Sequence, residues 1–136
     1  MSKQNKAREL SACETMIMKL IWDADEDIAV QELIVKMMES YSKDYARTTM
    51  VTFLKKLADK GYVSTYRVGR ASFAHAEKDE DLYKQMLMKE EMNFWFDGKL
   101  PAMVAAICNV HSISADEICD MRILLDKLEE NPICPA

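Results

Sequence analysis

The 136-residue sequence contains few of the residues on which catalytic sites depend. It has three glycines and two histidines. The glycines form no run of the kind that cradles a nucleotide phosphate. His75 and His111 are the only side chains of the type that titrates near neutral pH, and neither stands beside a nucleophile in a recognisable arrangement. We therefore expect a protein that is not an enzyme, with His75 an ordinary residue on a strand face.

Long apolar runs are also missing from the sequence. None approaches the roughly 18 residues of a membrane-spanning helix, and the first ten residues, MSKQNKAREL, lack the apolar core of a secretory signal. We expect a cytoplasmic protein with no membrane insertion. The chain is 49% hydrophobic and 30% charged, which favours a globular fold over disorder. Its length suits one or two small folded units.

The four cysteines lack the paired CxxC or CxC spacing that is typical of metal sites. They are Cys13, Cys108, Cys119 and Cys134. In a cytoplasmic protein this spacing favours free thiols over disulfides. A looser metal site formed by Cys108, His111 and Cys119 is the alternative, but core thiols and a surface histidine are the simpler interpretation. We expect no metal and no cofactor.

What the sequence does contain is an uneven charge distribution. The net charge is −5, yet residues 43–78 hold eight basic and three acidic side chains, a local charge of +5, which leaves −10 elsewhere. A basic segment within an acidic protein is typical of a surface that binds a polyanion, and the acidic remainder limits indiscriminate binding.

The residues up to 78 predict three helices followed by a hairpin. Ser11 and Glu14 form a capping-box pattern that begins the first helix. Helical spacing of apolar residues predicts a second helix over approximately 30–41, with Leu33, Ile34, Met37 and Met38 inward, and a third within 46–63, stopped by Gly61. The alternating stretches YVSTYRV and ASFAHA, joined by Gly69 and Arg70, predict the hairpin.

Two strands alone would be only marginally stable. We therefore expect the hairpin to pack on the helices or to pair with a short strand at Ile28. In the first of its strands, Tyr62 is predicted to share a face with Ser64.

From Asp79 onward the chain reads as helical throughout. A long helix follows, broken at Gly98 and Pro101, then a helix over approximately 102–110. A second capping box, at Ser114 and Glu117, begins a last helix that extends through Glu130. The predicted fold class is mainly α with a small β-hairpin: a winged helix-turn-helix DNA-binding domain in residues 1–78 and a helical dimerisation domain in residues 79–136.

In a winged helix-turn-helix, the third helix enters the major groove of DNA and the hairpin lies along the backbone. The outer face of the predicted third helix carries threonines where glutamates would repel a duplex, and short hydroxyl side chains allow close approach. The candidate DNA-binding residues are Lys43, Arg47, Thr48, Thr49, Thr52, Lys56, Arg67 and Arg70. The alternative is an ordinary solvated face on a winged protein-interaction module without sequence-specific DNA binding.

Four segments resemble a known family in order and spacing. LSACETMIMKLIW, VQELIVKM, ARTTMVTFLKKLADKGYV and VGRASFAHAEKDED are similar to the first-helix, second-helix, recognition-helix and wing segments of the BlaI/MecI/CopY family of bacterial repressors. The resemblance implies a homodimeric repressor that binds a palindromic operator upstream of antibiotic-resistance or related stress genes. It places groove contacts on Thr48, Thr49, Thr52 and Lys56, and it places Val51 where some relatives have arginine.

The C-terminal helices also resemble the dimerisation region of this family. They carry more apolar surface than about 55 residues can bury alone, and pairing would bury it; a monomer whose tail packs on its own winged domain is the alternative. The expected interface residues are Phe94, Trp95, Leu100, Met103, Val104, Ile107, Ile118, Met121 and Leu125.

The resemblance further implies how such a repressor is released from DNA. In the antibiotic-responsive branch, a membrane sensor protease triggers cleavage within the dimerisation region. The corresponding bond here is Ala106–Ile107, where the relatives have Asn-Phe. The copper-responsive branch relies on a CxCxxxxCxC tail, but here Cys134 stands alone in NPICPA, which disfavours copper or zinc sensing of that type.

Overall fold

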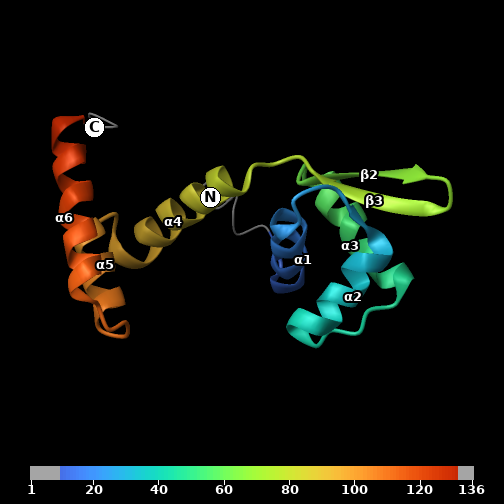
Figure 1. Ribbon diagram of the computed structural model, residues 1–136, viewed down its shortest axis with the longest axis horizontal. Helices are drawn as coiled ribbons and strands as arrows, with labels where there is room; N and C mark the ends of the chain where they lie inside the picture. Colours follow the sequence, from blue (N-terminus) through green and yellow to red (C-terminus); the bar gives the residue numbers. More distant parts are fainter. Residues whose placement is uncertain (1–9, 132–136) are drawn as a thin grey trace. The chain divides into compact units, whose positions relative to one another are not determined.

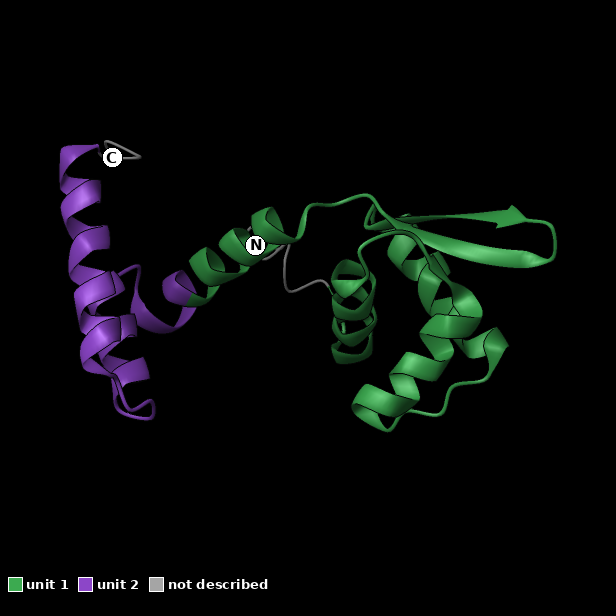
Figure 2. Cartoon of the chain, viewed as in Figure 1, with its two compact units in different colours: residues 1–91 green, residues 92–136 purple. Residues whose placement is uncertain are grey.

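The computed structural model describes residues 10–131, and the chain divides into two compact units, residues 1–91 and residues 92–136 (Figure 2). The elements run in the order shown in Figure 1: α1 (Ala12–Asp23), β1 (Ile28–Ala29), α2 (Val30–Tyr41), α3 (Arg47–Asp59), β2 (Val63–Val68), β3 (Ala71–Ala76), α4 (Glu80–Phe96), α5 (Leu100–Cys108) and α6 (Ala115–Glu130). The first unit is a winged helix-turn-helix, as predicted, and the second consists of helices in its described part.

Helix α1 begins at the predicted capping box. The Ser11 hydroxyl accepts a hydrogen bond from the Glu14 amide at 3.1 Å, and the Glu14 carboxylate accepts one from the Ser11 amide at 2.7 Å. These two bonds satisfy backbone donors that a helix start otherwise leaves unpaired. The capped helix presents Ile17 and Met18, both fully buried, to the core of the first unit.

Helices α2 and α3 complete that core. Leu33 and Met37 of α2 are fully buried, and so are Met50 and Leu57 of α3. The prediction that Met38 faces inward is wrong, because half of its side chain is exposed. It follows Met37 by one residue, a rotation of about 100° that turns it away from the buried stripe.

The sheet has three antiparallel strands in the order β1-β3-β2. Ile28 of β1 pairs with Ala74 of β3, so the predicted strand at Ile28 is confirmed and the hairpin both pairs with it and packs on helices. Strand β2 begins only at Val63. The prediction that Tyr62 shares a strand face with Ser64 is therefore wrong, and Tyr62 is buried in the core. At the hairpin turn, Gly69 has φ +62°, a backbone conformation that suits glycine.

The start of α4 belongs to the first unit. Tyr83 is buried, and its ring lies 5.2 Å from that of Trp22 and 5.9 Å from that of Tyr62. The Trp22 indole donates to the backbone carbonyl of Lys78 at 2.8 Å. These contacts join the start of α4 to the first unit, and the division between the compact units falls between residues 91 and 92. The boundary predicted from the sequence is near residue 78.

In the second unit, the break after α4 falls at Asp97 and Gly98, which both have positive φ. The sequence predicts that Pro101 breaks a helix. Instead, Pro101 lies in the first turn of α5, where its missing amide hydrogen costs no helical bond. The capping box predicted for the last helix is confirmed: the Glu117 amide donates to the Ser114 hydroxyl at 3.1 Å and the Ser114 amide to the Glu117 carboxylate at 2.9 Å.

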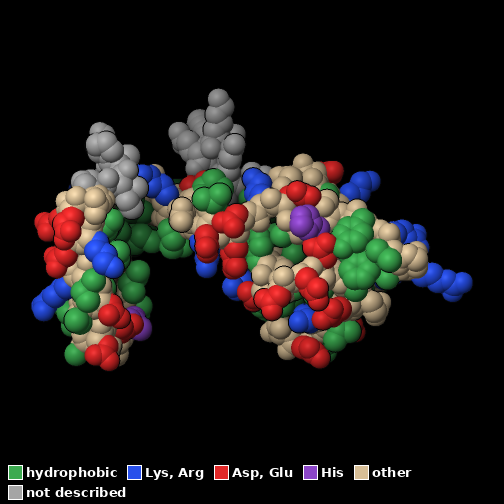
Figure 3. Space-filling model, turned by 45° about the horizontal axis from the view of Figure 1, so that its top comes forward, with side chains coloured by type: hydrophobic (Ala, Val, Ile, Leu, Met, Phe, Trp, Pro, Cys, Tyr) green, Lys and Arg blue, Asp and Glu red, His purple; other side chains and the backbone are tan. Residues whose placement is uncertain are grey.

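Apolar side chains of α5 and α6 remain on the surface. Neither helix contains a buried residue, and apolar side chains are visible over this unit in Figure 3. The large hydrophobic residues exposed on these helices include Leu100, Ile107, Ile118, Met121, Leu124 and Leu125. Across residues 10–131, we find no helix with the length and apolar character needed to cross a bilayer.

Candidate nucleic-acid interface

The outer face of α3 is fully open to solvent. Met50, Leu54 and Leu57 are buried on one side of the helix, and the exposed side carries Thr48, Thr49, Thr52, Lys55 and Lys56. The first turn of the helix contains no acidic residue. A charge-poor stretch of threonines with cations beside it is therefore the surface that this helix presents outward.

The hydroxyl of Thr52 is held within the helix. It donates to the backbone carbonyl of Thr48 at 2.9 Å. Threonine commonly satisfies its hydroxyl in this way when it lies inside a helix. The bond uses the hydroxyl hydrogen and leaves the oxygen lone pairs and the methyl group of Thr52 for an incoming surface.

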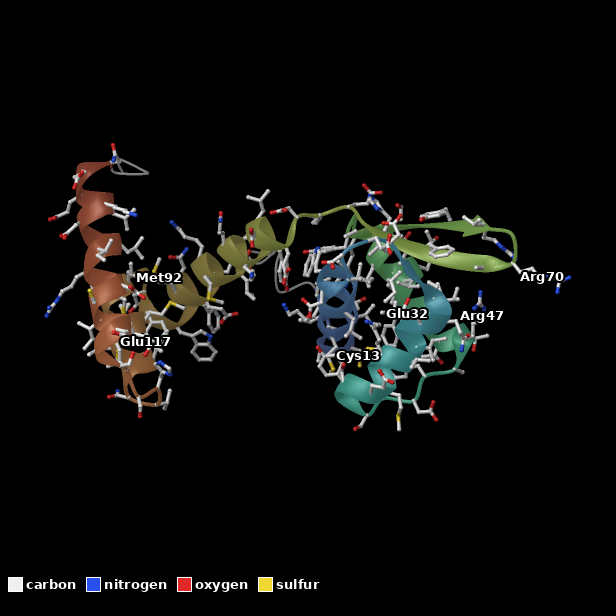
Figure 4. The ribbon with its side chains drawn as sticks, in the orientation of Figure 1. Cys13, Glu32, Arg47, Arg70, Met92 and Glu117 are labelled. Carbon is white, nitrogen blue, oxygen red and sulfur yellow. The ribbon has the colours of Figure 1, made fainter. Side chains whose placement is uncertain are left out.

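Cations from the helix and from the hairpin come together at one end of α3. Figure 4 shows Arg47 at the N-terminal end of α3, extending towards the hairpin, and Arg70 at the hairpin tip. The guanidinium of Arg47 donates to the Ser72 hydroxyl of β3 at 3.3 Å. Arg67 of β2 is the register partner of Ser72. Of the sequence-predicted residues, Arg47 and Arg67 therefore meet at Ser72, while Arg70 lies at the tip of the hairpin.

Lys43 lies in the segment between α2 and α3 and is exposed. Helix α2 ends at Tyr41; its C-cap, Ser42, has φ +57°, and the Lys43 amide donates to the Met37 carbonyl at 3.3 Å. Lys56 is on α3, with its ammonium 5.8 Å from the centroid of the Phe53 ring.

The cations of this surface are not neutralised by acids. Within residues 10–131, no ion pair involves Lys43, Arg47, Lys56, Arg67 or Arg70. Some lysines elsewhere on the winged unit are paired with acids; Lys19, for example, lies 3.0 Å from Asp23 and 2.9 Å from Glu80. Unpaired cations on one surface are what a polyanion requires, because their field is not cancelled locally.

Two lysines of the basic segment, Lys60 and Lys78, make contacts within the protein. The Lys60 ammonium lies 2.8 Å from the carboxylate of Glu14, a residue that is only 2% exposed. Burial by itself raises the pKa of Glu14, but hydrogen bonds from Lys60 and the Ser11 amide outweigh burial, and the pKa is lowered. Lys78 lies 4.7 Å over the Tyr62 ring. The charge count of the sequence therefore overstates the cations available for binding.

Sequence reasoning missed Lys55. It is exposed on α3, three residues after Thr52, and so shares the face of Thr48 and Thr52. This three-residue spacing from Thr52 was enough to predict from the sequence that Lys55 lies on the same face. Within the described residues, no ion pair involves Lys55.

Sequence reasoning also missed a polar network on the other face of the hairpin. The Asp27 carboxylate accepts a hydrogen bond from the Tyr66 hydroxyl at 2.6 Å and lies 2.7 Å from Nδ1 of His75. This hydrogen bond and the charge of Asp27 raise the pKa of His75. His75 is an exposed residue of β3, as predicted. No local pattern links Asp27 to partners 39 and 48 residues away.

The thiols and histidines do not gather into a metal site in the part of the chain that the structure describes. Cys13, Cys108 and Cys119 are free, but Cys108 and Cys119 are exposed, so the prediction that they are core thiols is wrong. The Tyr45 hydroxyl lies 2.8 Å from the Cys13 sulfur. His111 lies 3.1 Å from the Glu117 carboxylate. Cys134 lies outside the described residues.

Known proteins are similar to this chain over most of its length. The chain is 25% identical over 122 residues to the penicillinase repressor of Bacillus licheniformis, covering 90% of this chain and 93% of that protein. It is 24% identical over 126 residues to the methicillin resistance regulatory protein MecI of Staphylococcus aureus (strain N315), covering 90% and 98%. The solved complex structure of hsRosR-S4 shares the fold, with a TM-score of 0.52 at 15% identity over 93% of this chain and 96% of that chain.

A family profile also matches most of the chain. The profile described as penicillinase repressor matches residues 10–127, which is far more than half of the chain. It spans the winged unit and most of the helices that follow it. The chain therefore belongs to the penicillinase repressor family.

Proposed function

We propose that this protein is a homodimeric transcriptional repressor that binds a palindromic DNA operator through α3 and the wing. The observation that carries the proposal is the exposed threonine face of α3, flanked by cations that make no ion pair in residues 10–131. Membership of the penicillinase repressor family supports it. On the basis of this family membership, we propose that the regulated genes are antibiotic-resistance or related stress genes.

In this proposal, α3 lies in the major groove. Thr48, Thr49 and Thr52 approach the base edges, where a hydroxyl bonds to donors and acceptors and a methyl group meets the thymine methyl. Lys56 also contacts the groove, at the other end of this helix face. Arg67 and Arg70 of the wing bind phosphates or the adjacent minor groove, and Lys43 and Arg47 bind phosphates beside α3.

Dimer formation follows from the unburied surface of the second unit. One winged domain reads few base pairs, and two linked domains combine their binding free energies through effective concentration. Pairing of α5 and α6 with a second copy would remove Leu100, Ile107 and Leu125 from water, each of which is exposed in the single chain. Phe94, Trp95, Met103, Val104, Ile118 and Met121 complete the proposed interface.

Release from DNA is proposed to occur by cleavage of the Ala106–Ile107 bond after a signal from a membrane sensor protease. This bond lies in the last turn of α5. The carbonyl of Ala106 accepts from the Asn109 amide at 3.3 Å, and that of Ile107 from the His111 amide at 2.9 Å. Since proteases cut extended backbone, the last turn of α5 must unwind before cleavage, and the cut separates α6 from the winged unit.

The test is a gel-shift selection from a pool of random DNA with the full chain, followed by charge reversal. Thr52→Glu and Lys56→Glu should each abolish the sequence-specific shift, since each places an anion against the duplex. Lys84→Glu, an exposed residue of α4, is the matched control and should bind as the wild type does. Sedimentation should show that all three variants remain dimers. Unchanged DNA binding by both α3 variants would overturn the assignment of the reading face.

The alternative function is a winged protein-interaction module. Such a module needs neither a threonine-rich helix face flanked by cations nor an arginine at the hairpin tip. It would enrich no sequence from the random pool at physiological salt, whereas a repressor would enrich a palindrome.

A further inference from the structure

A cavity of about 380 Å³ lies between α3 and the wing. Val30, Val51, Leu54, Lys55 and Ala58 line it from the helical side, and Thr65, Tyr66, Arg67 and Ser72 line it from the hairpin. Its size falls within the range of roughly 300–1,000 Å³ that is common for small-molecule sites. All of these residues belong to the first unit.

The cavity has an apolar floor and a cationic rim. Val51 and Ala58 are exposed and give the cavity apolar surface, and Val30 and Leu54, which are almost fully buried, close its floor. Lys55 and Arg67 stand at the exposed edge, and no acid lines the cavity. A third cation is close by, because Arg47 donates to the Ser72 hydroxyl. This lining matches a molecule with an apolar body and one anionic group.

Contact with DNA alone does not account for this lining. Phosphate oxygens bind the cations of the rim, but they gain nothing from valine and leucine side chains, which favour an apolar occupant. A ligand that fills the floor and places its anion between Lys55 and Arg67 would satisfy both parts of the cavity.

We propose that this cavity is a regulatory site for a small amphipathic anion, such as an aromatic carboxylate, and that its occupancy weakens DNA binding. The second part of this proposal, that occupancy weakens DNA binding, rests on the proposed function. The ligand anion neutralises Lys55 and Arg67, two cations that face the duplex. Each cation withdrawn from the DNA lowers the slope of log affinity against log salt by about 1. By linkage, DNA must lower the affinity of the ligand by the same factor.

Binding is tested first without DNA, by calorimetric titration of the full chain with 1-naphthoate. The neutral isostere 1-naphthamide should bind at least about tenfold more weakly, because it lacks the charge that Lys55 and Arg67 recognise. Lys55→Gln should weaken naphthoate binding by about tenfold. Lys56→Gln, which makes the same change one residue away outside the cavity, should leave it unaltered.

A filling substitution provides the second variant. Ala58→Met places a larger side chain into the cavity from an exposed helical position and should abolish naphthoate binding, while Ala12→Met on α1 should not. Thermal unfolding identifies any loss of fold. Equal binding of naphthoate and naphthamide, or undiminished naphthoate binding by a folded Ala58→Met protein, would overturn the site.

The regulatory half is tested with the selected operator. Naphthoate should lower the operator affinity of the wild type and reduce its salt slope by about 1 to 2, and it should have no effect on Ala58→Met. Naphthoate binding without any effect on operator affinity would overturn the regulation but leave the site. Failure of the chain to select any operator would overturn the proposed function, and the calorimetric result would still decide whether the site exists.

Discussion

The Arg47 guanidinium donates a hydrogen bond to the Ser72 hydroxyl at 3.3 Å, and this bond joins the first residue of α3 to strand β3 of the wing. The two elements that a winged helix-turn-helix uses on DNA are therefore linked directly by a side chain. Arg47 carries both a charge and this link, whereas Ser72 carries only the link. Substitution of each residue separates the two contributions.

Arg47→Ala should weaken operator binding and lower the slope of log affinity against log salt by about 1, because one phosphate contact is lost. Ser72→Ala removes no charge, so its salt slope should equal that of the wild type even if the affinity falls slightly. Fluorescence anisotropy with a labelled operator over a series of salt concentrations measures both quantities. Equal slopes for Arg47→Ala and the wild type would show that Arg47 does not contact a phosphate.

The buried carboxylate of Glu14 should be important for stability. Glu14→Gln keeps an acceptor for the Ser11 amide but removes the charge paired with Lys60, so we expect a loss of about 1–3 kcal/mol in the free energy of unfolding. Glu32→Gln is the matched control. Glu32 is exposed and lies 3.8 Å from Lys36, so its loss should change stability by no more than about 0.5 kcal/mol. Urea unfolding followed by circular dichroism compares the two.

The same pair predicts a pH dependence. Because the pKa of Glu14 is lowered in the folded state, its contribution is fully present above the unfolded pKa and is lost as pH falls through the folded pKa. Protonated Glu14 resembles glutamine. The difference in unfolding free energy between the wild type and Glu14→Gln should therefore be constant near neutral pH and shrink on acidification below about pH 4.5. A difference that grows on acidification would contradict the lowered pKa.

The accuracy of the sequence predictions depends on how local the determining contacts are. Both capping boxes were predicted, since Ser11 and Glu14, like Ser114 and Glu117, are three residues apart. The ion pair of Lys60 with Glu14 was not predicted, because its two residues are 46 positions apart in the sequence. Helical spacing located the buried stripes but gave Met38 the wrong side, because a period of 3.6 does not define the edge of a stripe.

The hairpin shows the same limit. Alternation identified both strands, yet Tyr62 is buried in the core, where its ring packs edge-on against Tyr83 of α4, a contact that alternation along a strand does not predict. The candidate DNA-binding residues could be named because they share one helix and one turn. Their proximity across α3 and the wing, and the cavity between these elements, required the tertiary structure. Lys60 is not available to bind DNA because the fold pairs it with Glu14, and its residue type alone does not show this.

Dimer formation should depend on the exposed stripe of α6. Leu125 is 56% exposed, and Leu125→Asp should raise the dimer dissociation constant at least about 30-fold by placing a charge in an apolar interface. Val35 of α2 is similarly exposed, at 46%, and Val35→Asp should leave the dimer intact. Sedimentation equilibrium at micromolar concentrations measures both. A monomeric wild type, or a Leu125→Asp dimer as tight as that of the wild type, would argue against this interface.

His75 should titrate above the ordinary pKa of histidine, which is about 6.5. Its Nδ1 lies 2.7 Å from the Asp27 carboxylate; this hydrogen bond, followed by the charges of Asp27 and Glu77, raises the pKa. A raised folded pKa means that the stabilisation from the protonated ring is present below the unfolded pKa and is lost as pH rises through the folded pKa. The Asp27 carboxylate also accepts from Tyr66, so the contact ties the turn before β1 to both strands of the hairpin.

The titration can be followed by NMR through the ring signals of His75. Asp27→Asn should lower the midpoint, because the amide keeps a hydrogen-bonding oxygen but loses the charge that favours the protonated ring. Asp25→Asn, in the same turn, is the matched control, since no hydrogen bond within residues 10–131 joins Asp25 to His75. It should shift the midpoint less than Asp27→Asn does. If the two variants shift the midpoint equally, the effect comes from the general acidity of this turn, and the specific contact between Asp27 and His75 does not set the pKa.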